Sequence, residues 1–151
     1  MEAAAAGEFH IAVDCANPDR MARFWAQALG YELEGPPVPH QSWKEYWVSV
    51  GVPADEVEDG YDSIVDPGGC RPRIWFQQVS EAKAVKNRLR LDLLAGGGWQ
   101  VSVEERERRV GAEASRLVEA GAVQRHIMDS ADANHHASAM ADPEGNEFDI
   151  V

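Results

Sequence analysis

The sequence predicts an α+β fold made of two βαβββ modules, and three observations support this prediction. The turn phrase Asp-Pro-x-Gly occurs at residues 66–69 and 142–145, and an alternating polar and apolar segment follows it each time, as in a half-buried strand. Each half of the chain also contains one amphipathic helical pattern that ends at a glycine, Gly30 and Gly121. A repeat of this length indicates two copies of one unit that bury a shared face, here residues 8–80 and 86–151 of a single domain.

The first strand and helix follow directly from residue type and spacing. Residues 9–15 alternate as a strand does, with His10 and Ala12 on one face. Asn17 is a good helix N-cap, Pro18 suits the first helical position, and apolar residues then recur at helical spacing. His10 is either a hydrogen-bonded core histidine or a residue that faces a cavity.

The rest of the first half is predicted to be mostly extended. We expect a strand around residues 43–50, an acidic loop over residues 55–59 and a strand over residues 73–79. This places Trp43, Trp47 and Trp75 on sheet strands, where they either fill the core or form an aromatic wall for a flat ligand.

The second half begins with a predicted strand over residues 88–94 and a glycine-rich linker or lid at residues 96–98. Ser102 and Glu105 have the S-x-x-E spacing of a capping box, so a helix begins there, and its charged run at residues 104–109 is expected to face water. Its predicted buried stripe comprises Val110, Ala114, Leu117, Val118 and Ala120. Short strands are expected at residues 123–127 and 137–140. The preceding His135-His136 pair lies either in a solvated loop or at the mouth of a cavity.

The last strand carries two carboxylates on one face. Glu147 and Asp149 are two residues apart and leave the strand on the same side, whereas Phe148 and Ile150 leave it on the other. If the apolar pair packs under a helix, both carboxylates point to the concave side of the sheet. Otherwise they face water.

Composition narrows the class of protein. The chain has 151 residues, 26 acidic and 14 basic, for a formal net charge of -12. This balance argues against nucleic acid as a partner, because phosphate-backbone binding needs clustered lysine and arginine. No apolar run is long enough to span a membrane, and residues 1–7 resemble a disordered cytoplasmic N-terminus rather than a signal peptide. Cys15 and Cys70 form no disulfide framework, and Cys15 is expected in the core.

Several phrases together resemble the vicinal oxygen chelate superfamily, which comprises glyoxalases, bleomycin-resistance proteins and extradiol dioxygenases. They are the opening His-Ile-Ala-Val-Asp, the later Arg-Phe-Trp and Leu-Gly, and the closing Asp-Pro-Glu-Gly-Asn-Glu-Phe. Residues 86–89 and 142–148 are most similar to its actinobacterial glyoxalase-like domain branch. The resemblance implies one cup-shaped, barrel-like mixed sheet with the helices outside, a small-molecule cavity and a homodimer.

The resemblance also implies where a metal would bind. Metalloenzymes of the superfamily hold a divalent ion with residues of the first and last strands of each module, and the matching positions here are His10, Gln77, Arg90 and Asp149, with Trp75 on the same face as Gln77. Arg90 stands where metal-binding relatives have a second histidine. Arginine only donates hydrogen bonds and stays protonated, so it cannot ligate a cation. It would instead pair with Glu147 or Asp149.

These features give three functional hypotheses. The first is a metal-independent binder of a small cationic or polar aromatic molecule, with no cofactor, in which Trp47 and Trp75 form apolar walls and His10, Gln77, Arg90, Glu147 and Asp149 orient the ligand. The second is a lyase or dioxygenase of the glyoxalase type, in which His10 and Asp149 hold one Fe, Mn, Ni or Zn ion and Glu147 or His135 moves a proton. In the third, Glu147 and Asp149 act as acid and base without metal.

Overall fold

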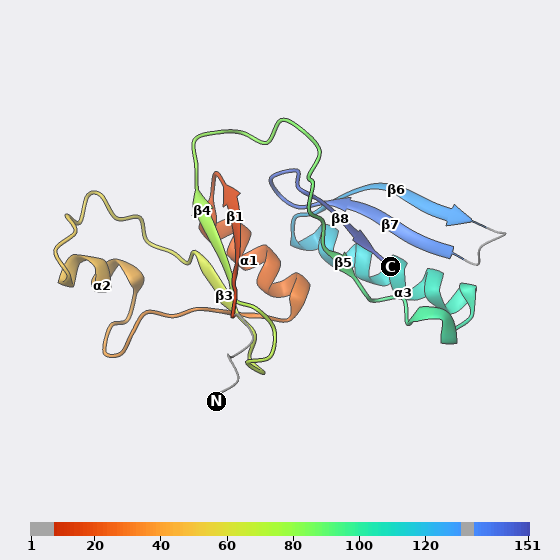
Figure 1. The fold of residues 1–151 in the computed structure, drawn as a ribbon, viewed down its shortest axis with the longest axis horizontal. Helices are drawn as coiled ribbons and strands as arrows, with labels where there is room; N and C mark the ends of the chain where they lie inside the picture. Colours follow the sequence, from red (N-terminus) through yellow and green to blue (C-terminus); the bar gives the residue numbers. More distant parts are fainter. Residues whose placement is uncertain (1–7, 131–134) are drawn as a thin grey trace, which may run out of the picture. The chain divides into compact units, whose positions relative to one another are not determined.

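The computed structural model describes residues 8–130 and 135–151, which form two compact units, Met1–Glu81 and Ala82–Val151 (Figure 1). The α+β class is confirmed, because each unit combines a four-stranded mixed sheet with helix. Among the described residues, no helix has both the length and the apolarity that a bilayer span requires. The expected disorder of residues 1–7 concerns a segment outside the described residues.

The first unit contains β1 (Ile11–Cys15), α1 (Pro18–Leu29), β2 (Glu32–Leu33), α2 (Trp43–Ser49), β3 (Ser63–Val65) and β4 (Ile74–Gln78). Its sheet has the order β1-β4-β3-β2, and β1 runs parallel to β4. The predicted caps of α1 are confirmed: Asn17 accepts a hydrogen bond from the Arg20 amide, and Gly30 adopts a left-handed conformation with φ of 66°. Cys15 is buried, as expected, and Cys70 is exposed; both are free thiols.

The strand predicted around residues 43–50 is wrong, because these residues form helix α2. The Ser42 hydroxyl accepts a hydrogen bond from the Glu45 amide, and the Glu45 carboxylate accepts one from the Gln41 amide. This is close to a capping box, except that the returning bond comes from the amide one residue before the N-cap. Trp43 and Trp47 therefore lie on a helix, and only Trp75 lies on a strand.

The second unit contains β5 (Asp92–Leu93), a short 3-10 helix η1 (Gly98–Gln100), α3 (Val103–Ala120), β6 (Val123–Ser130), β7 (His135–Ala141) and β8 (Glu147–Ile150). The strand order is β5-β8-β7-β6, with β5 parallel to β8 (Figure 1). The predicted capping box of α3 is confirmed by a hydrogen bond from the Glu105 amide to the Ser102 hydroxyl. β5 is shorter than the predicted strand of residues 88–94, because only Asp92 and Leu93 pair with β8 and the chain turns at Ala95, whose amide donates to the Leu93 carbonyl.

Burial divides the second sheet into two faces. Phe148 and Ile150 are fully buried, as are Val110 and Leu117 of α3, so the helix covers the face to which the even-numbered residues of β8 point. The predicted stripe of α3 is wrong at Val118, which is 44% exposed.

Two expectations for polar side chains of this unit fail. Arg106 does not face water with the rest of its charged run. It is buried, donates a hydrogen bond to the Gly98 carbonyl and lies over the Trp99 ring. Of the two alternatives for the histidine pair, the solvated loop is wrong, because His135 and His136 begin β7 and His136 is only 9% exposed.

Candidate functional site

A row of side chains crosses the face of the second sheet that α3 does not cover. The register pairs Asp92 with Asp149, Asp149 with Ala139, and Ala139 with His126, so these four residues share one face. Ala137 and Ala141 lie on the same face of β7, on either side of Ala139. Ala137, Ala141 and Asp149 are all buried, so part of this face is covered although α3 lies on the other side.

Arg90 and Asp149 form an ion pair on this face, with 3.1 Å between the guanidinium Nη2 and the carboxylate Oδ2. Arg90 also donates to Asp92, at 2.8 Å from Nε to Oδ1 and 3.4 Å from Nη2 to Oδ2. Burial raises the pKa of the Asp149 carboxyl above its ordinary value, and the nearby Arg90 charge opposes that rise. The guanidinium is thus held between two carboxylates, with its bidentate contact made to Asp92 rather than Asp149.

Glu147 has a different environment from Asp149. Its carboxylate accepts hydrogen bonds from the Asn87 amide at 3.0 Å and from the Lys83 ammonium at 3.1 Å. The Asn87 amide contributes most to lowering the pKa of Glu147 to about 2. A carboxylate whose pKa lies this far below neutral pH is a poor proton acceptor. The geometry therefore favours Glu147 as an anchor for residues 83–87 over a catalytic acid or base.

His10, Trp75 and Gln77 belong to one face of the first sheet, opposite to buried Ile74 and Phe76. The His10 and Trp75 rings meet edge to face with their centroids 6.5 Å apart.

The two ladders identify which residue of β4 corresponds to Asp149. Trp75 pairs with Ala12, two residues after His10, just as Asp149 pairs with Asp92, two residues after Arg90. By this count Trp75, rather than Gln77, occupies the position equivalent to Asp149.

A half-open pocket of about 320 Å³ lies in the first unit, between the start of α1, helix α2 and residues 56–62. Two tryptophans and a tyrosine supply its aromatic surface: Trp43, Trp47 and Tyr61. Five carboxylic acids line it as well: Asp19, Glu56, Glu58, Asp59 and Asp62. Among the described residues, no lysine or arginine belongs to this lining. Arg23, outside it, forms an ion pair with Asp19 at 2.9 Å and lies over the Tyr61 ring, so the excess of negative charge comes from the other four acids.

Local contacts fix the walls of this acidic aromatic pocket. The Trp43 and Trp47 rings stack at 26° with centroids 6.2 Å apart, and the Trp43 indole N–H donates to the Glu34 carbonyl at 2.7 Å. Opposite them, the Asp19 carboxylate accepts the Tyr61 amide at 2.9 Å. Gly60, with φ of 139°, leaves no room for a Cβ beside Asp19, so glycine allows the acidic loop to approach α1 closely.

The pocket was not predicted as a unit, although the sequence contained a signal for it. Ser42 and Glu45 have the same S-x-x-E spacing as Ser102 and Glu105, and Trp43, Tyr46 and Trp47 follow at helical spacing. Trp75 contacts this region, because its indole N–H donates to Asp62, a lining residue, at 3.3 Å.

The donor groups do not fit a metal at the positions that the resemblance implies. Of the four matching residues, only His10 and Asp149 offer good ligand atoms. Arg90 carries a positive charge 3.1 Å from Asp149. The strand register places the Trp75 indole at the position where a carboxylate or an amide would bind the metal. The side chains at these positions therefore do not suit a metal ion.

Comparison with known proteins agrees with this architecture. Among solved structures, the chain is similar to a hypothetical protein from S. aureus (TM-score 0.58, 12% identity, 97% of this chain and 94% of that chain). It is also similar to a glyoxalase/bleomycin resistance protein/dioxygenase family enzyme from Burkholderia phytofirmans (TM-score 0.52, 17% identity, 93% and 94%). A third similar structure is the fosfomycin resistance protein FosX from Listeria monocytogenes, complexed with Mn(II) (TM-score 0.55, 10% identity, 96% and 88%).

At these identities the structural similarity concerns the fold alone. No curated protein matches the sequence. A family model described as "Glyoxalase-like domain" matches residues 10–151, nearly the whole chain. The chain therefore belongs to the glyoxalase-like domain family.

Proposed function

We propose that this protein binds a small organic cation with an aromatic group, without a metal, in the acidic aromatic pocket of its first unit. The observation that carries the proposal is the lining of that pocket, which combines stacked tryptophans with five carboxylic acids and no basic residue among the described residues. Its volume of about 320 Å³ lies at the lower end of the usual range for small-molecule sites.

Charge and ring chemistry together select the ligand class. Carboxylates around a partly enclosed hollow attract cations and repel anions, and the formal charge of -12 extends that preference to the whole chain. A cation over the face of a tryptophan gains about 0.5–2 kcal/mol. An ammonium group linked to a flat ring satisfies both parts of the lining.

Polar groups on the open faces of the sheets would orient such a ligand. Trp75 is joined to the pocket through Asp62, and His10 and Gln77 share its face. We propose Trp75, His10 and Gln77 as further contacts for this ligand, all within the first unit. Separately, we propose that Arg90 beside Asp149 offers a polar ligand contact of its own in the second unit. Arg90 keeps two carboxylate partners, so it favours a hydrogen-bond acceptor on the ligand over a free anion.

Calorimetric titration with benzyltrimethylammonium, benzyl alcohol and phenylacetate tests this function. We expect the cation to bind at least about 10-fold more tightly than the anion, because the two differ in the sign of their charge. Trp47→Ala should weaken cation binding by about 5-fold or more, within the range of one cation–π contact. Trp99→Ala is the matched control, because Trp99 lies in the second unit and is 76% exposed.

Equal binding of phenylacetate, or no effect of Trp47→Ala, would contradict the proposal. Metal independence is tested by repeating the titration after treatment with a chelator, which should leave binding unchanged. Loss of binding after chelation and in His10→Ala would instead favour the divalent-metal-dependent lyase or dioxygenase.

A further inference from the structure

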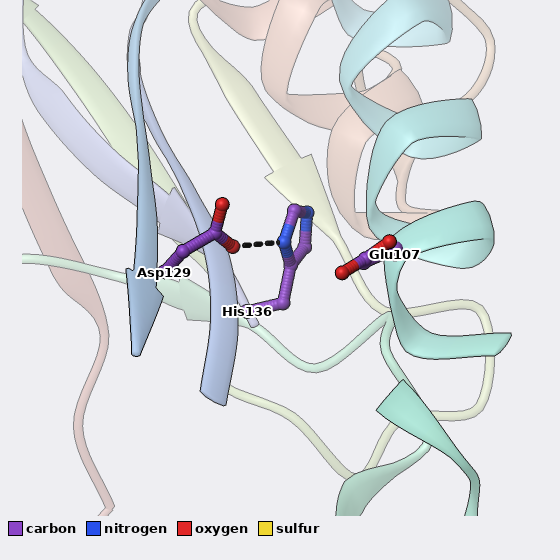
Figure 2. Close-up of side chains that lie close together, drawn as sticks. All are labelled: Glu107, Asp129 and His136. Atoms are coloured by element: carbon purple, nitrogen blue, oxygen red, sulfur yellow. Dashed lines mark hydrogen bonds and ion pairs between the residues drawn. The ribbon is translucent and has the colours of Figure 1, made fainter. Parts of the chain in front are cut away.

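A second group of possible ligand atoms lies in the second unit, on the side of the sheet that α3 covers. Glu107 projects from α3, Asp129 from β6 and His136 from β7 (Figure 2). Figure 2 shows the imidazole of His136 between the two carboxylates. Three separate elements thus bring one nitrogen and two oxygen donors within 4.8 Å of one another.

Strand register fixes two of these side chains against each other. Asp129 and His136 are directly opposite in the β6–β7 ladder, and His136 Nδ1 lies 2.5 Å from Asp129 Oδ1. His136 has the same strand parity as Ser138 and Met140, which are both buried. It therefore points away from the face that carries Asp149 and Ala139, so this group is separate from the open face.

We propose that Glu107, Asp129 and His136 bind one divalent transition-metal ion, with zinc as the preferred metal. One donor atom from each residue lies within 4.8 Å of the other two. Ligand atoms around a tetrahedral zinc ion, with bonds of about 2.0–2.1 Å, are separated by roughly 3.3 Å. Binding an ion would replace the 2.5 Å contact between His136 and Asp129, which must open, while Glu107 rotates inward. Both movements are possible because the Glu107 and Asp129 side chains are exposed.

The local charge also favours a cation. Two carboxylates flank one imidazole, and within residues 8–130 and 135–151 no lysine or arginine forms an ion pair with Glu107. A bound divalent ion would compensate this negative charge, and the 63% exposure of the Asp129 side chain provides a route from solvent. His136 is nine-tenths buried, so its ring is held in place before the ion arrives.

Ligand chemistry narrows the choice of metal. One nitrogen and two carboxylate oxygens suit zinc and its transition-metal neighbours, whereas magnesium and calcium prefer oxygen ligands alone. Such an ion would link α3 to the β6–β7 hairpin. Its expected role is to stabilise the second unit, because the site and the open face are on opposite sides of the sheet.

Zinc titration of tag-free, chelator-treated protein tests this site. We expect one equivalent of zinc by calorimetry and a rise in the unfolding temperature that magnesium does not reproduce. Glu107→Gln and His136→Gln should each weaken zinc binding by at least about 10-fold and abolish the rise. His126→Gln is the control, because His126 lies on β6 but pairs with Ala139, on the open face.

Circular dichroism confirms that each variant folds, and Glu107→Gln alters an exposed side chain, so its result does not depend on intact packing. The proposal is overturned if wild type binds no stoichiometric zinc, or if Glu107→Gln and His136→Gln bind it as wild type does. It is also overturned if His10→Ala abolishes zinc binding while Glu107→Gln does not, because that result assigns the metal to the first unit. None of these outcomes depends on binding of the organic cation.

Discussion

Replacing Arg90 by methionine tests the electrostatic organisation of the open face of the second sheet. The change keeps most of the aliphatic stem but removes the charge 3.1 Å from Asp149. Asp149, whose side chain is only 8% exposed, would then face Asp92 on the neighbouring strand with no cation between them. We expect the free energy of unfolding to fall.

The magnitude follows from the exposure of the two partners. Removing one partner of a fully buried ion pair costs about 3–5 kcal/mol, because the remaining charge stays buried and unpaired. The Arg90 side chain is 40% exposed, so water already screens part of the interaction. We therefore expect a loss of about 1–2 kcal/mol at neutral pH, or roughly 3–8 °C in unfolding temperature for a domain of this size.

The sign of the pH dependence distinguishes this mechanism from lost packing. Burial already raises the pKa of Asp149 above its unfolded value, and losing Arg90 raises it further. The folded state then holds a proton that the unfolded state has released, so stability falls as pH rises above the ordinary aspartate pKa. The deficit of Arg90→Met should thus be large at pH 7.5 and smaller near pH 4.

Urea unfolding followed by circular dichroism at both pH values measures this difference. Arg90→Met/Asp149→Asn is the matched control, because its neutral amide no longer needs a cation and should recover most of the loss. The same deficit at both pH values, or no recovery in the double variant, would refute the electrostatic explanation.

Two further predictions concern β8. Phe148→Ala should lower the free energy of unfolding by about 3–5 kcal/mol in urea titrations, because it empties a fully buried site under α3; a loss below about 1 kcal/mol would contradict that packing. Glu147→Gln should speed hydrogen exchange at the Asn87 amide and weaken the acid dependence of stability. The pKa of Glu147 is lowered to about 2, so its contribution to the free energy of unfolding is present above the ordinary glutamate pKa and is lost as pH falls toward 2. An unchanged exchange rate at the Asn87 amide would argue that Glu147 does not anchor residues 83–87.

Local rules predicted those parts of the fold that depend on near neighbours in the chain. Asn17 and Ser102 cap their helices because a side-chain oxygen three residues before an amide can accept its hydrogen bond. The alternation of Phe148 and Asp149 likewise assigned the two faces of β8. Such features need only backbone geometry and residue type.

Tertiary contacts explain why other elements were missed. Aromatic residues favour strands in general, yet Trp43 and Trp47 lie on a helix because the Ser42 cap and the stacked rings stabilise one turn after another. Arg106 is buried because its guanidinium reaches the Gly98 carbonyl, a partner that helix periodicity does not reveal. His136 was not predicted to lie on a strand, because β7 begins two residues earlier than the predicted strand of residues 137–140. Its ring is therefore buried on the side of the sheet that α3 covers.

The parts of the candidate site that depend on strand alternation could be predicted from the sequence. The part that depends on the position of a loop could not. The contact between Arg90 and Asp149 follows from two strands that run side by side, and the sequence predicted such a pairing. The acidic aromatic pocket requires residues 56–62 to approach α1, which the Asp19 contact with Tyr61 and the left-handed Gly60 make possible. Contacts of this kind join residues about forty positions apart in the chain.

The two units place different chemistry at equivalent positions. Trp75 and Asp149 both lie between buried apolar neighbours, and His10 and Arg90 each lie two residues before the residue that pairs with them. Because an indole and a guanidinium offer no lone pair to a cation, two of these four positions cannot ligate a metal. The residue types at the repeated positions, rather than the repeated backbone, therefore give the first unit an aromatic surface next to an acidic pocket and the second a charged row.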